Sequence, residues 1–398
     1  MYRTYCRAFQ GVMKLANYAL PYGKPTELTG VGAAEKIADV LRERHAATVL
    51  VVTGKHITAQ GLNRPMLDSL ERAGIRPVLF TEMSGNPTDA DVEHGFALYR
   101  KENCQAIIAF GGGTPMDCAK AIGAKVVHPD KSVAQLQGLL KVRRRIPLFF
   151  AVPTTAGTGS ETTIAAVITD TATHRKASIN DPALMPKYAV LDPTLTVALP
   201  PEITAATGMD ALCHAVEAYT NHTYCTGLEN DLAKKAVRLI YENLLTAYRS
   251  GTDLTARQNM LRASFYAGRA FTRGCVGYVH AVGHTLGGLY GMPHGTAMAI
   301  LLPHVLRRYG DAVTSRLSEL ADVCGIEGTT AEEKAENFIT WIEEMKRQMN
   351  IPEKVDCIRE EDIPQMVAWA VKEANPLYPV PAIWTKADFA DFIGSVRA

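Results

Sequence analysis

The sequence predicts a two-domain protein, with an α/β N-terminal domain built on a doubly wound, mostly parallel sheet (residues 1–199) and an all-α C-terminal domain (residues 200–398). Three observations predict this architecture. Short apolar runs alternate with helical segments up to about residue 199, and from there helical periodicities continue to the C-terminus with few strand candidates. The 398 residues also exceed the length of about 250 to 300 at which a single hydrophobic core stops growing.

Continuous apolar runs mark the strands of the N-terminal domain. Parallel strands covered on both faces are typically apolar throughout, rather than alternating with polar residues. The runs are TVLVVT (48–53), RPVLF (76–80), QAIIAF (105–110) and PLFFAV (147–152), with IAAVITD (164–170) and YAVLDP (188–193) as two further β-rich pieces. Residues 59–74 and 88–103 between them have helical spacing. This alternation indicates a doubly wound sheet.

Composition and charge exclude several classes of protein. A net charge of +1 provides no broad field for nucleic acid or a membrane surface, so we expect neither as a partner. No apolar run has the length of a signal or a membrane span, and we interpret the first 25 residues as an arm packed on the first domain. The eight cysteines include no C-x-x-C pair, which favours reduced thiols and a cytoplasmic location.

A strand, a glycine turn and a helix follow one another in residues 105–126. The glycines at 111–113 allow main-chain N–H groups to approach a ligand closely. Thr114 is a suitable N-cap, with Pro115 in the first helical position and Asp117 placed to reach back to the cap. Since a helix N-terminus behind a strand binds anions, we expect a phosphate site here. The turn lacks the last glycine of G-x-G-x-x-G, so the usual dinucleotide fingerprint does not apply.

A second loop, VPTTAGTGSET (152–162), is rich in hydroxyls and glycines. Such clusters are often simple turns. This one follows a buried strand, however, and open α/β sheets bind ligands at the carboxyl ends of their strands. Both interpretations remain open from the residues alone.

Four histidines and one aspartate form a candidate metal site. Asp210 and His214 lie four residues apart in a helical pattern, His280 and His284 repeat that spacing, and His294 follows a glycine-rich bend. Histidines at this spacing, completed by a carboxylate from another helix, suit a borderline divalent metal. The alternative is a set of core histidines hydrogen-bonded to carbonyls. The spacing leaves open which histidines are ligands.

Five motifs along the chain occur together in one known family. They are GGGTPMDCAKAIG (111–123), PTTAGTGSE (153–161), LPPEITAATGMDALCHAVEAY (199–219), GYVHAVGHTLGG (277–288) and PHGTAMAILLP (293–303). In order and spacing they resemble the iron-containing (group III) alcohol dehydrogenases, over nearly the whole chain. The resemblance implies the dehydroquinate synthase-like fold, with a nicotinamide-cofactor domain, a helical metal-binding domain and assembly into a homodimer or higher homo-oligomer.

The same resemblance implies a role for individual residues. The implied ligands of the metal, Fe(II) or else Zn(II) or another divalent ion, are Asp210, His214, His280 and His294. His284 is implied to be a catalytic, non-ligand histidine that faces substrate and nicotinamide, and Phe271 to line the substrate pocket. The implied cofactor contacts are Gly54, Asn86, Gly111, Gly112, Gly113, Thr114, Asp117, Thr154, Thr155 and Lys176.

One position departs from the family pattern. An acidic residue commonly ends the first strand in the family, where it binds the adenosine ribose and favours NAD, but this chain has Gly54. A 2′-phosphate would meet no repulsive carboxylate there, and Lys55 would attract it. The cofactor is therefore expected to be NAD or NADP, with NADP permitted by Gly54.

The implied activity is that of a metal-dependent, NAD(P)-linked alcohol dehydrogenase or aldehyde reductase. Hydride passes between the alcohol carbon and the nicotinamide while a divalent metal polarises the substrate oxygen. The expected partner is a small alcohol or aldehyde. Alternatives are a polyol (glycerol-type) dehydrogenase or a dehydroquinate-synthase-like lyase on the same fold, and, in another class, an inactive nucleotide-binding structural or regulatory protein.

Overall fold

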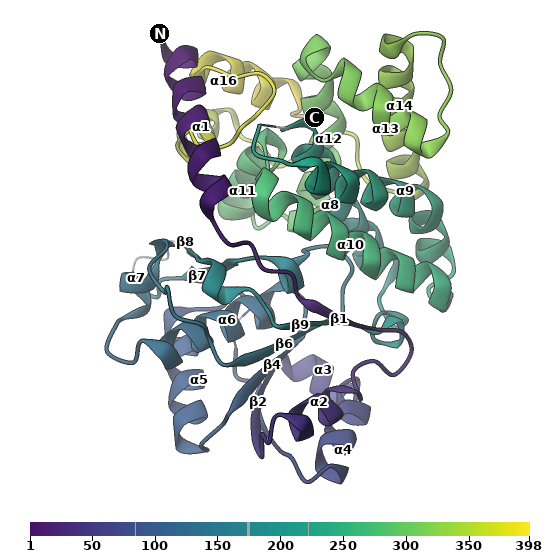
Figure 1. The fold of residues 1–398 in the computed structure, drawn as a ribbon. Coiled ribbons are helices and arrows are strands. Elements are labelled where there is room, and N and C mark those ends of the chain that lie inside the picture. Colours follow the sequence, from purple (N-terminus) through teal and green to yellow (C-terminus); the bar gives the residue numbers. More distant parts are fainter. Residues whose placement is uncertain (84, 173–175, 222) are drawn as a thin grey trace. The chain divides into compact units, whose positions relative to one another are not determined.

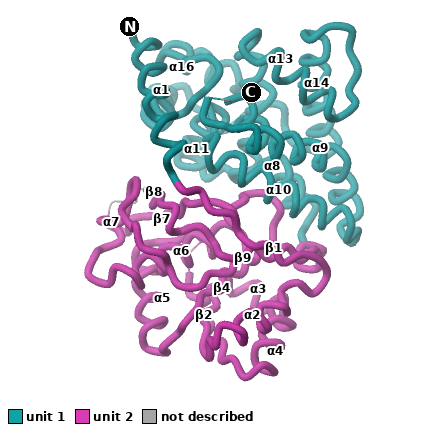
Figure 2. Tube along the Cα trace, in the orientation of Figure 1, with its two compact units in different colours: residues 1–20, 199–398 teal, residues 21–198 magenta. Residues whose placement is uncertain are grey.

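The chain divides into two compact units in the computed structural model, which describes residues 1–83, 85–172, 176–221 and 223–398. Residues 21–198 form one unit, and residues 1–20 together with 199–398 form the other (Figure 2). The first contains a parallel sheet with helices, and the second is helical. The predicted fold class is confirmed.

A six-stranded sheet forms the centre of the α/β unit, in the order β1-β9-β6-β4-β2-β3 (Figure 1). All of its described pairings are parallel. The strands are β1 Thr26–Thr29, β2 Thr48–Thr53, β3 Arg76–Phe80, β4 Ala106–Gly111, β6 Leu148–Pro153 and β9 Tyr188–Leu191. The four continuous apolar runs predicted as buried strands are β2, β3, β4 and β6, each within one residue of the expected bounds.

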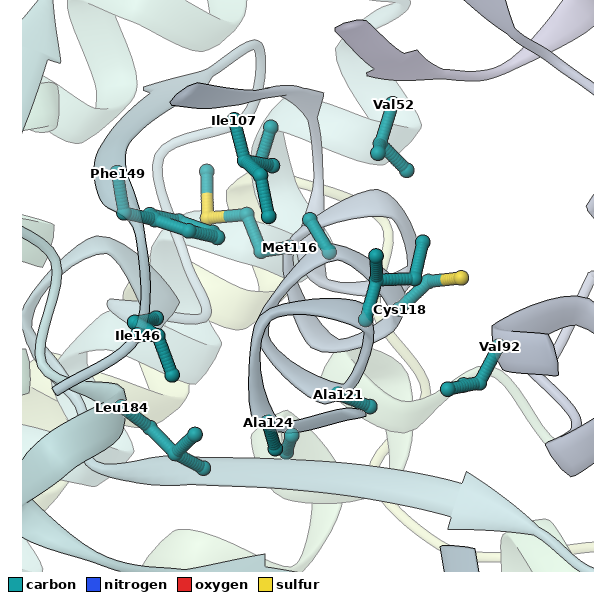
Figure 3. Close-up of a cluster of buried hydrophobic side chains, with 14 of the residues drawn as sticks. Val52, Val92, Ile107, Met116, Cys118, Ala121, Ala124, Ile146, Phe149 and Leu184 are labelled. Carbon is teal, nitrogen blue, oxygen red and sulfur yellow. The ribbon is translucent and has the colours of Figure 1, made fainter. Parts of the chain in front are cut away.

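Helices cover both faces of this sheet. They are α2 Ile37–Glu43, α3 Lys55–Ala59, α4 Arg64–Arg72, α5 Asp89–Lys101, α6 Gly113–Val127 and α7 Val133–Leu136. Val52 of β2 belongs to one buried cluster with Val92 of α5 and Met116 of α6 (Figure 3). The adjacent Val51 belongs to a second cluster with Leu41 of α2 and Leu70 of α4. Successive strand residues thus face opposite cores, which is why the run has no polar alternation.

A second, three-stranded sheet has the order β5-β8-β7. Its strands are β5 Gly138–Leu139, β7 Ala165–Thr169 and β8 Lys176–Asn180, with β7 antiparallel to β8. The β-rich piece at 164–170 is therefore a strand, but of this smaller sheet. Strands β8 and β1 carry no apolar run, because they are largely half-buried or exposed, and sequence analysis missed both.

The other unit consists of helices α1 Tyr2–Ala19, α8 Pro201–Thr220, α9 Gly227–Arg249, α10 Leu254–Gly274, α11 Tyr278–Tyr290, α12 His294–Tyr309, α13 Thr314–Cys324, α14 Ala331–Gln348, α15 Ile363–Ala374 and α16 Lys386–Ser395. Helix α8 is buried along most of its length. It has many contacts with α9, α10 and α12, which makes it the central helix of the unit. Among the described residues, no helix combines the length and apolar character needed to cross a bilayer.

The N-terminal helix packs elsewhere than expected. Residues 1–20 group with the helical unit, so the prediction that they pack on the first domain is wrong. The reason is a set of hydrogen bonds to a distant loop. Arg7 donates to the carbonyl oxygens of Val380 (2.8 Å) and Pro381 (2.6 Å), and the buried Gln10 donates to that of Tyr378 (2.7 Å).

Candidate functional site

The glycine turn after β4 borders a cavity in the α/β unit. The cavity has a volume of about 450 Å³ and is lined by Gly54, Lys55, His56, Ile57, Met83, Gly85, Gly112, Gly113, Thr114 and Pro115. Its lining includes the residues that follow β2 and β4, where parallel sheets bind ligands. Gly111 has a φ of 149°, and a Cβ there would lie 2.6 Å from Pro115 Cγ, so only glycine suits this turn.

Helix α6 has no side-chain cap at its start. It begins at Gly113 with Gly112 as N-cap, two residues before the positions that the sequence predicted. Thr114 is therefore not the cap, and its hydroxyl donates to the carbonyl oxygen of Gly85 (3.0 Å) instead. The first N–H groups of a helix have no partner within it, so this uncapped turn is suited to an anion.

The hydroxyl-rich loop lies beside the glycine turn. The backbone N–H of Thr154 donates to the carbonyl oxygen of Gly111 (3.1 Å). A Cβ built on Gly112 would lie 3.4 Å from Thr155 Oγ1. The structure thus brings together the two segments that the sequence left as separate candidates.

Three further predicted cofactor residues have partners within the α/β unit. Asp117 was expected to reach back to the helix start, but it accepts hydrogen bonds from Ser160 Oγ and the N–H of Val167 instead, both at 3.1 Å. Lys176 and Asn86 are brought together from distant segments, with Lys176 Nζ donating to Asn86 Oδ1 (3.0 Å). Both of these residues are exposed.

The four predicted metal ligands converge in the helical unit. Asp210 and His214 lie one turn apart on α8, His280 lies on α11, and His294 is the first residue of α12. Each offers a ligand atom, and all four atoms lie within 4.8 Å of one another. Asp210 Oδ1 lies 3.3 Å from Nε2 of His294, 3.8 Å from Nε2 of His280 and 3.9 Å from Nε2 of His214.

The residues present fit a divalent metal. Asp210 Oδ1 and His280 Nε2 are buried, 3.8 Å apart, and have no hydrogen-bond partner among the described residues. An unpaired buried polar group costs about 1–3 kcal/mol unless something binds it. One carboxylate and three imidazoles form a nitrogen and oxygen donor set that suits Fe(II), Zn(II) and similar ions.

The electrostatics of this cluster favour protonation states that bind metal. Burial lowers the pKa of His214 to about 4 and, together with His294, places the pKa of His280 well below its ordinary value. Burial opposes ionisation of Asp210, but the neighbouring His214 and His294 outweigh it and hold the pKa of that carboxyl below its usual range. Ionised carboxylates and neutral imidazoles are the forms that coordinate metals.

Two family profiles together match almost the whole chain. The family described as iron-containing alcohol dehydrogenase matches residues 25–193, and the C-terminal part of the Fe-containing alcohol dehydrogenase family matches residues 204–394. The chain belongs to the iron-containing alcohol dehydrogenase family. This confirms the resemblance that the motifs indicated, and the protein is an oxidoreductase.

Individual relatives of this alcohol dehydrogenase cover most of its length. The 1,3-propanediol dehydrogenase of Klebsiella pneumoniae is 40% identical over 332 residues, which are 82% of this chain and 85% of the relative. The NAD-dependent methanol dehydrogenase of Bacillus methanolicus is 34% identical over 383 residues, 95% of this chain and 99% of that one. A 1,3-propanediol oxidoreductase structure matches with a TM-score of 0.91 at 35% identity, over 95% of this chain and 99% of that chain. The predicted dehydrogenase function is confirmed, and the alternatives are not favoured.

Sequence analysis missed Glu217, which lies three residues after His214 on α8 of this alcohol dehydrogenase. Its Oε2 is 2.5 Å from His280 Nδ1, and its Oε1 accepts a hydrogen bond from the N–H of Val279 (2.8 Å). Histidine ligands are commonly oriented by a carboxylate on the other ring nitrogen. The available signal was the spacing, since Asp210, His214 and Glu217 follow one another on one helix.

We expect Glu217→Gln to weaken metal binding roughly 10- to 100-fold, because an amide orients His280 less firmly and leaves the imidazole less basic. The measurement is titration of metal-free protein with Zn(II) in competition with a chelator. Glu202→Gln, at an exposed position of the same helix, is the control and should bind as the wild type does. Unchanged affinity in Glu217→Gln would exclude this role.

His284 lies outside the group of four ligand atoms. Its Nδ1 is 2.7 Å from Glu373 Oε1, which also accepts a hydrogen bond from the Tyr378 hydroxyl (2.9 Å). Its ring stacks on that of His294, with centroids 5.3 Å apart. Glu373 and Tyr378 had no signal in the sequence, because they lie about 90 residues from His284 along the chain.

Phe271, the predicted pocket residue, is a half-buried residue of α10. Its ring stacks on that of His214, with centroids 4.2 Å apart and an interplanar angle of 17°. It therefore lies directly against one of the predicted ligands, where its volume limits the space beside the metal cluster.

Proposed function

We propose that this alcohol dehydrogenase interconverts small primary alcohols or diols with their aldehydes, using NAD or NADP and a divalent metal held by Asp210, His214, His280 and His294. The observation that carries the proposal is the convergence of those four ligand atoms within 4.8 Å of one another. The substrates named for two relatives, 1,3-propanediol and methanol, support a short alcohol.

The metal ligands and His284 have different parts in this proposal. A divalent ion, when bound, supplies the Lewis acidity that makes an alcohol easier to deprotonate. Asp210 provides the negative charge of the ligand set, and the neutral imidazoles complete it. His284, which is partly exposed and oriented by Glu373, exchanges the substrate proton with solvent.

We infer that the cavity beside β2 and β4 takes the dinucleotide. The uncapped start of α6 and the glycine turn bind the pyrophosphate, and Gly54 with Lys55 adjoins the adenosine end. Asp117 contributes indirectly, by holding Ser160. The residues proposed to contact or shape this site remain Gly54, Asn86, Gly111, Gly112, Gly113, Thr114, Asp117, Thr154, Thr155 and Lys176.

An assay of reaction, cofactor and metal together tests this function. Oxidation of NADH and of NADPH is followed across a panel of short aldehydes, anaerobically, with Fe(II) or with a chelator. We expect turnover that the chelator abolishes and Fe(II) restores. The absence of turnover with every aldehyde, and with every alcohol in the reverse direction, would overturn the proposal.

Gly54→Asp is expected to raise the KM for NADPH at least about tenfold relative to that for NADH, because a carboxylate repels a 2′-phosphate. The fold should tolerate the change, since no atom lies within 4 Å of a Cβ built on Gly54, whose φ is −78°. Gly54→Ala is the control for the added side chain. An unchanged ratio of the two KM values would place the 2′-position elsewhere.

We also infer a cytoplasmic homo-oligomer, at least a dimer. The eight cysteines are free thiols, as expected for a reducing compartment. Large apolar side chains are exposed on α1, including Tyr5, Val12 and Leu15, and a second copy of the chain could cover them. Light scattering from the purified protein gives the oligomeric state, and a monomeric mass would contradict the assembly.

A further inference from the structure

Helix α6 contains a fully buried lysine that the proposed chemistry does not use. Lys120 has no exposed surface. Its Nζ lies within hydrogen-bond distance of five oxygens: Ser160 O (2.7 Å) and Oγ (3.2 Å), Thr163 O (3.0 Å) and Oγ1 (2.8 Å), and Ala165 O (3.0 Å). All five acceptors belong to residues 160–165, which include the end of the hydroxyl-rich loop (152–162) and the residues directly after it.

Asp117 binds the same segment from the same side of the helix. It lies three residues before Lys120, so the two side chains are neighbours on α6. Asp117 accepts from Ser160 Oγ, while that hydroxyl also lies 3.2 Å from Lys120 Nζ. Ser160 is therefore bound by both Asp117 and Lys120.

Stability alone does not account for a charge at this position. Taking an ammonium out of water is costly, even though Asp117 and Glu161 offset part of the cost here. Replacing a buried ion pair by a well-packed apolar residue is often neutral or stabilising. What the Lys120 contacts do provide is a fixed position for residues 160–165 relative to helix α6.

That segment ends the loop beside the phosphate-binding turn. Thr155 Oγ1 lies 3.4 Å from where a Cβ on Gly112 would be, and Thr158 Cγ2 lies 3.4 Å from the corresponding point on Gly113. The start of α6 and the loop therefore form two adjacent sides of one site. Lys120, on the same helix, fixes the loop relative to that start.

We propose that Lys120 is a positioning residue of the dinucleotide site. Its side chain holds residues 154–160 against helix α6, so that Thr155 lies beside the glycine turn before the cofactor binds. The inference rests on the proposed cofactor role of this site. Lys120 is buried and acts only through the loop. Losing the preorganised loop should raise the Kd for the dinucleotide at least about tenfold, because binding must then order it.

The test compares Lys120→Met with Lys125→Met in the full-length protein. Lys125 lies on the same helix, is also buried, and donates to the carbonyl oxygens of Pro129 (3.3 Å) and Lys131 (2.6 Å), away from the loop. The readouts are the Kd for NADH and NADPH, and hydrogen exchange of residues 154–160 without cofactor. We expect weaker binding and faster exchange only in Lys120→Met, with metal content unchanged, because the predicted ligands belong to the other unit.

The outcomes separate this inference from the proposed function. Wild-type Kd values in Lys120→Met, or equal weakening in both variants, would overturn the positioning role. If the wild type binds neither dinucleotide, the proposed function fails, while exchange of the loop still decides whether Lys120 holds it. Should Lys120→Met not fold, Ser160→Ala removes the hydroxyl that Asp117 and Lys120 share, and it should raise the Kd several-fold; an unchanged Kd there would count against the proposal.

Discussion

Asp210→Asn is expected to lose the metal and to lower turnover by at least about a thousandfold, since metal polarisation of a substrate oxygen is worth several kcal/mol. Asp210 is the carboxylate of the four-residue cluster, and its Oδ1 lies 3.3–3.9 Å from the Nε2 atoms of three histidines. Asparagine retains the shape but removes the negative charge. Metal content after anaerobic loading with Fe(II), together with kcat/KM, gives the two readouts.

The control for Asp210→Asn is Asp231→Asn, an exposed carboxylate on α9. It should retain a stoichiometric ion and wild-type turnover. The metal-free Asp210→Asn protein should remain folded, because the substitution removes a buried charge from a site without its counter-ion. An Asp210→Asn enzyme that keeps both its metal and its turnover would show that the ion is held elsewhere.

His284→Asn is expected to lower kcat roughly 10²- to 10⁴-fold, the usual contribution of a positioned acid or base, while the metal stays bound. His284 lies outside the four-atom ligand group, and its Nδ1 is engaged by Glu373. Asparagine can form a hydrogen bond to Glu373 but cannot carry the proton. Steady-state kinetics at saturating substrate provide the measurement, with metal content determined on the same sample.

Two results would contradict that assignment. Wild-type kcat in His284→Asn would mean that the substrate proton leaves by another route. Loss of the ion in the same variant would mean that His284 is a ligand. The control is His304→Asn, since His304 contacts the Glu353 carbonyl oxygen and lies outside the metal cluster.

The strands that could be predicted are those in which the sequence pattern directly reflects burial. Strands β2, β4 and β6 are covered on both faces, so their sequences are apolar throughout and their bounds could be read closely. Strands β1 and β8 are largely half-buried or exposed, and nothing in their composition separates them from loops. The docking of α1 depends on hydrogen bonds from Arg7 to carbonyls more than 370 residues away, which no local pattern contains.

The site divides in the same way. Residues one helical turn apart, such as Asp210 and His214, could be paired from spacing, and their motif also contained Glu217. Spacing could not separate His284 from His280, because both lie on α11 and differ by their partners, Glu373 and Glu217, on other helices. The N-cap was misassigned to Thr114 because the helix already begins at Gly113. Glycine has a freer backbone than other residues, and the capping preferences of side chains do not reveal an earlier start at such residues.

The most direct test of the account is a paired metal analysis of His294→Asn and His284→Asn. The side chains of His294 and His284 are similarly exposed, at 42% and 44%, and their rings stack on each other. The two substitutions are therefore made in nearly the same surroundings. Both proteins are loaded anaerobically with Fe(II), freed of excess ion and analysed for bound metal. We expect a stoichiometric ion in His284→Asn and its loss in His294→Asn. Retention in His294→Asn with loss in His284→Asn would contradict the division between ligand and catalytic histidine.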